Sequence, residues 1–223
     1  MTLAGFVPLS LCDYPGRVAA VVFTQGCNFR CPWCHNGHLL PLAADPLKRV
    51  SEEQVLAVLE ERRTRLGGVV VTGGEPTLQL ALPRFVRRLK ALGLDVKLDT
   101  NGSHPKVLRE LLADRLLDYV AMDVKAPWDK YDMLTGTACC DVAAVQVSMA
   151  LIAASGVPHA FRTTRVDPLL SEQEYGDIRT QIPHGSSHTW QSFRPAYSHD
   201  PALRSVDAIR HVQDQQTKAI RIR

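Results

Sequence analysis

The sequence lacks the long apolar segment that a membrane-spanning helix requires. No uninterrupted apolar run among its 223 residues reaches the length of about 18 that such a helix needs. The segment Met1–Pro8 also lacks the basic start and apolar centre of a secretory signal peptide. We therefore expect a cytoplasmic protein that does not associate with a membrane.

A strong excess of charge of one sign is also missing. The formal net charge is only +3, which is too small to indicate a nucleic-acid partner. Arginines and a lysine cluster over residues 62–65 and 84–90, a pattern that suits solvated helix faces. We expect no nucleic-acid partner.

The composition is otherwise that of an ordinary globular protein. Hydrophobic residues make up 45% and charged residues 22% of the chain. The length suits one domain with a substantial core. We expect a single domain over residues 1–223, with a core over about 17–194 and a C-terminal helix and tail over 195–223.

Three of the six cysteines lie together in one short segment. Cys27, Cys31 and Cys34 directly follow the apolar run 18–23, so a loop that leaves a buried strand gathers three thiols. Such a loop indicates ligands of a metal or a cluster rather than a disulfide framework. Cys12 and the adjacent pair Cys139-Cys140 stand outside this group, and we interpret them as packing or incidental thiols.

The spacing C-x3-C-x2-C favours iron–sulfur chemistry over zinc. Structural zinc usually takes two separated pairs of ligands, and no second C-x2-C or H-x3-5-H pair follows. An iron–sulfur cube normally takes four thiolates, so three thiolates leave one iron open to a substrate. A Cys3His zinc site completed by His35 remains an alternative, although His35 adjoins Cys34 without a spacer. Unrelated buried or redox cysteines are a further alternative.

The segment 24–36 resembles the signature of the radical S-adenosylmethionine (SAM) enzymes, C-x3-C-x-aromatic-C. The resemblance implies that Cys27, Cys31 and Cys34 bind a 4Fe-4S cluster. It also implies that the methionine part of SAM chelates the fourth iron. Trp33 occupies the aromatic position, and by the same resemblance it lies against the adenine of SAM.

Strand and helix patterns alternate along the chain. Strands are predicted over 18–24, 69–72, 95–98, 117–122, 159–164 and 188–193, and helices over about 51–66, 80–92, 104–112, 142–156, 171–180 and 203–213. Residues 5–15 suggest an extended stretch with a turn, residues 127–136 an irregular link, and residues 220–223 a small edge strand. Six alternating units predict an α/β fold with a parallel sheet. An eight-fold barrel takes about 250 residues, so an incomplete barrel or an open sheet is expected. The family resemblance favours a six-fold (β/α) partial barrel.

Four successive strands end in clusters suited to chemistry. Parallel α/β folds place their sites at the carboxyl ends of the strands, so these clusters should share one rim. They are the cysteine loop, Gly73-Gly74-Glu75, Asp99-Thr100-Asn101-Gly102 and Asp123-Val124-Lys125. Gly73 and Gly74 allow backbone to come close to a ligand, and Glu75 offers a carboxylate to an ammonium group. A plain turn is the alternative for the glycines and for residues 99–102.

The resemblance implies roles for these rim residues. In the family the Gly-Gly-Glu segment, here Gly73, Gly74 and Glu75, holds the amino group of SAM. In the glycyl-radical activating enzymes, Asp-Thr-Asn-Gly and Met-Asp-x-Lys occur at corresponding places and hold a monovalent cation. The cation is accordingly assigned to Asp99, Thr100, Met122 and Asp123, the carboxylate of SAM to Lys125, and further SAM contacts to Asp99, Asn101 and Asp123.

Arg162 continues the rim at the end of the following strand. A guanidinium group binds carboxylates in a planar, two-pronged geometry. Arg162 is therefore predicted to reach the cofactor or a substrate backbone, and a structural ion pair is an equal alternative.

Within the superfamily, the sequence resembles the activating proteins of anaerobic ribonucleoside-triphosphate reductase. The supporting segments are residues 13–16, 23–31, 34–36 and 122–127, with Cys12 at a position where an aliphatic residue is expected. The resemblance implies reductive cleavage of SAM to a 5′-deoxyadenosyl radical, which then forms a glycyl radical on the reductase. No further ferredoxin-like cysteine set is present in the sequence, so an external donor such as flavodoxin or ferredoxin is expected.

Three other functions remain open at this point. The chain could activate a different glycyl radical enzyme, or convert a small molecule as a 7-carboxy-7-deazaguanine synthase does. Both would keep the cluster and change the substrate. A zinc-stabilised binding module is the non-enzyme alternative.

Overall fold

The chain folds around one sheet whose strand order follows the sequence. The computed structural model describes residues 1–43, 49–137, 140–167 and 169–204, and within them the sheet order is β1-β2-β3-β4-β5-β6-β7. The strands are β1 (Leu3–Ser10), β2 (Ala19–Thr24), β3 (Gly68–Gly73), β4 (Asp95–Thr100), β5 (Tyr119–Asp123), β6 (His159–Arg165) and β7 (Ser187–Ser192). β1 pairs antiparallel with β2, and every other neighbouring pair is parallel.

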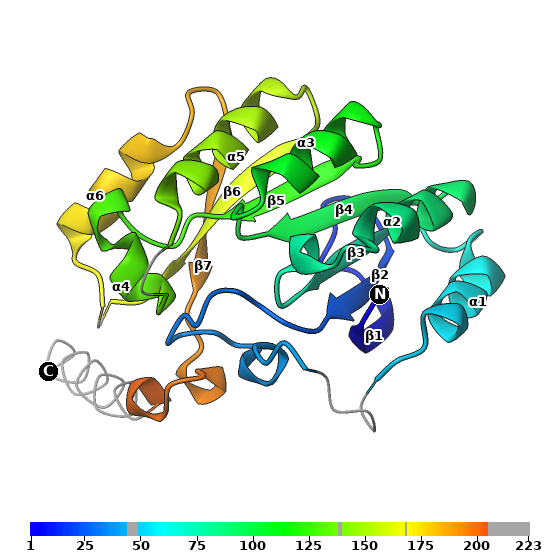
Figure 1. Ribbon diagram of the computed structural model, residues 1–223, viewed down its shortest axis with the longest axis horizontal. Coiled ribbons are helices and arrows are strands. Elements are labelled where there is room, and N and C mark those ends of the chain that lie inside the picture. Colours follow the sequence, from blue (N-terminus) through cyan, green and yellow to red (C-terminus); the bar gives the residue numbers. More distant parts are fainter. Residues whose placement is uncertain (44–48, 138–139, 168, 205–223) are drawn as a thin grey trace, which may run out of the picture.

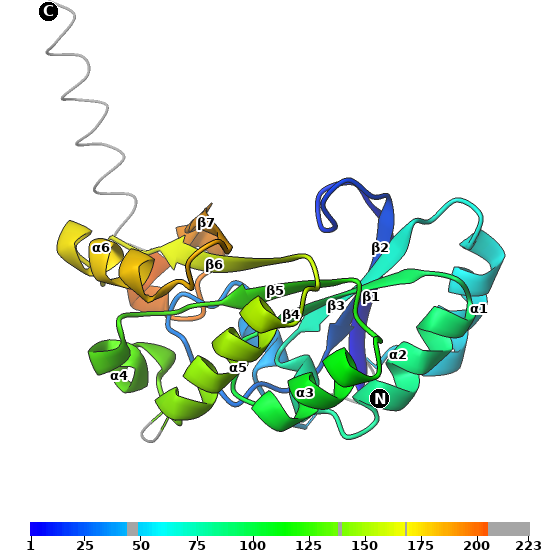
Figure 2. The ribbon, with the colours of Figure 1, turned by 90° about the horizontal axis from the view of Figure 1, so that it is seen from above.

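Helices connect the parallel strands and cover the sheet. They are α1 (Glu52–Arg62), α2 (Leu82–Ala91), α3 (Pro105–Ala113), α4 (Tyr131–Thr135), α5 (Val142–Ala154) and α6 (Glu172–Gln181), arranged as in Figure 1. Figure 2 shows α2, α3 and α5 on the same face of the sheet. The strands follow one another in sequence order and helices cover one face, so the sheet is an open, curved one. Its edge strands within the described residues are β1 and β7. This confirms the predicted α/β fold with a parallel sheet and partial-barrel architecture.

Strands β2 and β3 are buried on both faces, as their continuous apolar sequences predict. Val69 and Val71 of β3 belong to the main core between the sheet and the helices. Val70 points the other way and packs with Val21 and Tyr14 in a second, smaller cluster. Because successive side chains of a strand alternate between faces, a run of valines serves a strand that has a core on each side.

The first strand is the main addition to the predicted architecture. Residues 5–15 were expected to form an extended stretch with a turn, but β1 covers Leu3–Ser10 and pairs with β2, with Phe6 opposite Val22. An edge strand needs a partner on one side only, and the middle of β1 is largely half-buried or exposed. The sequence of β1 therefore lacks the strong apolar pattern of the central strands.

The helix termini follow the predicted signals more closely than the helix lengths do. Ser51 caps α1 by accepting a hydrogen bond from the amide of Gln54, and Ser171 and Glu174 form the complete predicted capping box of α6. α1 nevertheless ends at Arg62, earlier than the predicted 66, although Leu66 is still buried. In the link predicted to be irregular, α4 forms.

Some predicted features fall outside the described residues. Of the last predicted helix, 203–213, only residues 203 and 204 are described. The predicted edge strand 220–223 and Cys139 lie entirely outside the described residues. Among the described residues, the helices are too short or too polar to cross a bilayer.

Candidate active site at the carboxyl ends of the strands

A cavity of about 210 Å³ opens at the carboxyl ends of the parallel strands. Twelve of the fourteen predicted site residues line it: Cys27, Cys31, Trp33, Cys34, Gly73, Gly74, Asp99, Thr100, Asn101, Asp123, Lys125 and Arg162. The side chains of Glu75 and Met122 are instead buried in the protein.

Backbone hydrogen bonds hold the cysteine loop from two directions. The amide of Gly26 donates to Leu39 O at 2.8 Å, and the amide of Cys27 donates to Leu40 O at 3.2 Å. From the other side, the amide of Arg30 donates to Thr135 O at 2.7 Å. The segment at the end of α4, which the sequence analysis treated as an irregular link, thus positions the loop that carries the three thiols.

The two glycines after β3 allow that strand to approach the cysteine loop. A Cβ atom on Gly74 would lie 2.1 Å from Gly26 O, and Gly73 has a φ of +118°, which L side chains rarely adopt. Hydrogen bonds use this proximity: the amide of Gly74 donates to Thr24 O at 2.9 Å, and the amide of Glu75 donates to Gly26 O at 2.8 Å. The glycines were predicted to make room for a ligand, and in the structure they also make room for backbone.

The three thiols are largely withdrawn from water on the cavity wall. Burial raises the pKa of Cys27 to about 11 and that of Cys31 to about 12, and it also raises the pKa of Cys34. The nearby ammonium group of Lys125 lowers all three pKa values to a smaller extent. Thiolates at these positions therefore need a further source of positive charge, which iron supplies when it is bound.

The zinc alternative fits this geometry poorly. The ring of His35 stacks on Phe193 with a centroid separation of 5.8 Å, and its Nε2 accepts a hydrogen bond from the amide of Arg194 at 3.1 Å. Within the described part of the chain, no three His, Cys, Asp or Glu side chains are arranged to hold one metal ion. A cube places its irons at separate corners, so each thiolate binds its own iron.

Glu75 has a different environment from the one predicted. Its carboxylate is completely buried, and Oε1 accepts hydrogen bonds from the amide and hydroxyl of Thr77 and from the hydroxyl of Thr100. Oε2 accepts from the amide of Asn101 at 2.6 Å. Burial raises the pKa of Glu75 and these hydrogen bonds partly offset the rise. The carboxylate therefore joins the ends of β3 and β4 instead of facing an ammonium group in the cavity.

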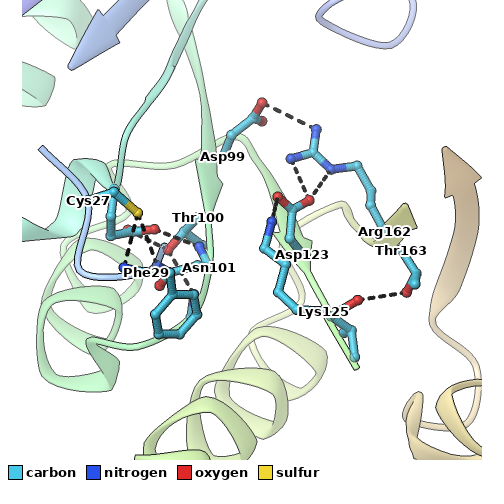
Figure 3. A network of polar contacts seen from close by, with 12 residues as sticks. Cys27, Phe29, Asp99, Thr100, Asn101, Asp123, Lys125, Arg162 and Thr163 are labelled. Carbon is cyan, nitrogen blue, oxygen red and sulfur yellow. Dashed lines mark hydrogen bonds and ion pairs between the residues drawn. The ribbon is translucent and has the colours of Figure 1, made fainter. Parts of the chain in front are cut away.

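Asn101 extends this network to the cysteine loop. Its side-chain amide donates to Asn28 Oδ1 at 2.9 Å and approaches Cys27 Sγ at 4.0 Å (Figure 3). Asn28 in turn donates to Ser103 Oγ at 2.9 Å, and Ser103 contacts His104 Nδ1 at the same distance. Asn28, Ser103 and His104 were not predicted from the sequence as site residues. These three residues lie inside or beside the predicted rim segments, and this position is the sequence signal that could have identified them.

Five charged side chains form an ion-pair network at the cavity, and four of them line it: Asp99, Asp123, Lys125 and Arg162. Arg162 lies between Asp99 and Asp123, and Lys125 approaches Asp123 (Figure 3). The fifth is Lys97, which pairs with Asp99 and was not identified from the sequence. Lys97 precedes Asp99 by two residues on β4, so both side chains lie on the same face of the sheet. Gln191 of β7 and Thr164 of β6 complete this side of the cavity.

The residues present suit an iron–sulfur cluster with SAM. Three thiols on one loop, buried at Cys27 and Cys31 and partly exposed at Cys34, provide the ligands of a cube with one open corner. The wall across from them carries an ammonium group on Lys125 that suits a carboxylate, and the glycine backbone of β3 lines the cavity between. The donor set is therefore complete within this chain.

Comparison with known proteins adds to this geometry. The sequence profile of the Radical SAM superfamily matches residues 21–177. The chain is 32% identical over 211 residues to a protein of Methanocaldococcus jannaschii with the provisional name glycyl-radical enzyme activating enzyme, covering 92% of this chain and 85% of that protein. A 7-carboxy-7-deazaguanine synthase of Rhodospirillum rubrum is 41% identical over 103 residues, which cover 46% of this chain and 39% of that protein.

A solved structure shares the fold. Streptococcus suis SuiB, bound to the precursor peptide SuiA, superimposes with a TM-score of 0.60 at 12% identity, over 87% of this chain and 46% of that one. At this identity the similarity concerns the fold alone.

Proposed function

The chain belongs to the radical SAM superfamily, and on this basis we propose that it forms a glycyl radical on an anaerobic ribonucleoside-triphosphate reductase. Enzymes of this superfamily use a 4Fe-4S cluster and SAM. When bound by Cys27, Cys31 and Cys34, the cluster would supply one electron to SAM, whose cleavage to methionine would yield a 5′-deoxyadenosyl radical able to take a hydrogen atom from a glycine α-carbon.

The observation that carries the proposal is the convergence of three thiols, two of them buried, and Lys125 on one cavity. The thiols belong to a single loop held by backbone hydrogen bonds, so their spacing is fixed before a cluster binds. Such preorganisation is what a cluster with an open corner requires, because the open corner must face the cofactor.

Different residues of the cavity bind different parts of SAM. Lys125 binds its carboxylate, and the backbone at Gly73 and Gly74 approaches its amino group. Trp33, which is buried on the cavity wall, lies against the adenine.

A glycyl radical enzyme is favoured as substrate by the extent of one relationship. The similarity to the protein provisionally named as a glycyl-radical enzyme activating enzyme extends over 92% of this chain. The segments 13–16, 23–31 and 122–127 carry the resemblance to the reductase activases in particular. The electron comes from an external donor such as flavodoxin or ferredoxin.

The test is to incubate anaerobically reconstituted protein with the reductase, SAM and reductant, and to record the electron paramagnetic resonance spectrum. We expect the doublet of a glycyl radical together with release of 5′-deoxyadenosine. Cys31→Ala should abolish both signals. Cys12→Ala is the matched control, because Cys12 is exposed and outside the cavity. Cofactor cleavage without a doublet would reject the reductase as substrate and leave the radical SAM chemistry intact.

The similarity to a 7-carboxy-7-deazaguanine synthase supports a second candidate, a small-molecule enzyme. It covers less than half of this chain, at 41% identity. Formation of 7-carboxy-7-deazaguanine by this protein in the absence of any protein substrate, detected by mass spectrometry, would favour this second candidate.

A further inference from the structure

Two carboxylates and one guanidinium group lie side by side at the end of the sheet. Asp99 is near the end of β4, Asp123 is the last residue of β5, and Arg162 on β6 is paired in register with Asp123. Because the three strands are neighbours and parallel, their ends present these side chains at one edge of the cavity.

The guanidinium group of Arg162 connects the two carboxylates. Its Nε and Nη2 atoms each lie 2.9 Å from Asp123 Oδ1, and its Nη1 atom lies 3.2 Å from Asp99 Oδ2 (Figure 3). A guanidinium group is planar and carries several N–H donors in a fixed arrangement, which suits it to hold two acceptors at once. Arg162 thus occupies the space between Asp99 and Asp123.

Lysines take the remaining carboxylate oxygens. Lys97 Nζ lies 2.6 Å from Asp99 Oδ1, and Lys125 Nζ lies 2.8 Å from Asp123 Oδ2. Each of the four carboxylate oxygens therefore has a cationic partner. Three cationic side chains face two carboxylates, so this group carries one positive charge in excess.

A monovalent metal cation does not fit this arrangement, contrary to what the resemblance implied for Asp99, Thr100, Met122 and Asp123. The ion would have to displace N–H donors from oxygens that already accept charged hydrogen bonds. It would also add positive charge to a half-buried group that already has an excess, where repulsion is weakly screened.

We propose that the Arg162 guanidinium takes the place of the monovalent cation, so that this enzyme binds SAM without sodium or potassium. The inference concerns the binding of SAM and does not depend on which substrate receives the radical.

The experiment compares salts of equal ionic strength. The affinity of the reconstituted protein for SAM is measured by titration calorimetry in choline, sodium and potassium chloride. For the wild type we expect affinities that agree within about twofold, because no cation is coupled to SAM. Arg162→Met removes the guanidinium group at similar length. This variant should bind SAM weakly in choline chloride, and its affinity for SAM should rise by about tenfold or more in sodium or potassium chloride.

Two further variants and a second measurement make the result specific. Arg162→Lys keeps the charge and should remain insensitive to the salt. Arg165→Met is the matched control on the same strand, because Arg165 pairs with Glu172 outside the cavity, and it should behave as the wild type. The ²³Na resonance should broaden with Arg162→Met and not with the wild type.

The outcomes decide the proposal. A wild-type affinity that rises about tenfold with sodium or potassium would overturn it. Equal weakening of Arg162→Met in all three salts would overturn it as well, because the guanidinium would then act in another way. If Arg162→Met fails to fold by circular dichroism, the salt series on the wild type and on Arg162→Lys still supports or rejects the proposal.

Discussion

The backbone amide of Asn101 donates a hydrogen bond of 2.6 Å to Glu75 Oε2 and so connects the loop after β4 to the loop after β3. Three other donors, from Thr77 and Thr100, converge on Oε1 of the same carboxylate. Through Asn101 the network reaches Asn28 in the cysteine loop. One buried carboxylate therefore joins three rim loops that are distant in sequence.

Glu75→Ala is expected to destabilise the protein by about 3 kcal/mol, because it leaves several buried donors without an acceptor. Chemical denaturation of the cluster-free protein measures this free energy of unfolding. Glu53→Ala is the control, since the Glu53 side chain is 76% exposed and should change stability by less than about 0.5 kcal/mol. Equal stabilities of the two variants would show that the network contributes little.

Gly74→Ala is expected to disturb the cysteine loop. The new Cβ would lie 2.1 Å from Gly26 O, so the backbone has to move, and overpacking of this kind costs about 1–3 kcal/mol. The iron content of Gly74→Ala after reconstitution should therefore be lower than that of the wild type. Gly176→Ala is the control, because Gly176 lies in α6 with open space around its Cβ position. There alanine should stabilise by about 0.5–1 kcal/mol. Normal iron content in Gly74→Ala would argue against a tight fit between the two loops.

The buried cysteines should react slowly in cluster-free protein. Thiolates are the reactive species, and burial raises the pKa of Cys31 to about 12. At pH 8 we expect iodoacetamide to modify the exposed Cys12 first, and Cys27 and Cys31 last. Peptide mapping by mass spectrometry gives the order. Rapid modification of Cys31 in folded protein would contradict the buried arrangement of the loop.

Asp123 should make the stability depend on acidic pH. Its folded-state pKa, about 2, lies below the ordinary value of 3.8. Its stabilisation is thus present above pH 3.8 and is lost as the pH falls towards 2, by about 2 kcal/mol at most. Urea denaturation at pH 5, 4 and 3 measures the loss. Asp123→Asn should flatten this dependence, whereas Asp114→Asn, at an exposed ion pair, should not. An unchanged slope in Asp123→Asn would show that Asp123 has no unusual pKa.

Much of the cavity could be predicted because its residues follow strands directly. Cys27, Gly73, Asp99 and Asp123 each come at or just after the end of a parallel strand, and the topology of such a sheet gathers these ends at one edge. Strand alternation also predicted that Asp123 and Lys125 lie close together, as their 2.8 Å ion pair shows. The predicted roles of these residues towards SAM stay predictions.

The residues whose environments could not be predicted make their contacts with groups that are distant in sequence. Lys97 lies within a predicted strand and carries no motif that singles it out, yet it is buried beside Asp99. Tyr14 belongs to a segment used for the resemblance, and it packs against Tyr119 on the sheet face away from the helices. In neither case does the local sequence show which distant group completes the environment.

The sequence by itself determined the alternation of strands and helices, the loop that carries three thiols, and the edge of the sheet at which the chemistry gathers. Those features depend on local periodicity and on the order of elements along the chain. Only the tertiary structure decided that Glu75 turns inward and that Arg162 lies between Asp99 and Asp123. The direction of a charged side chain depends on which oppositely charged or hydrogen-bonding groups the folded chain brings within about 3 Å of it.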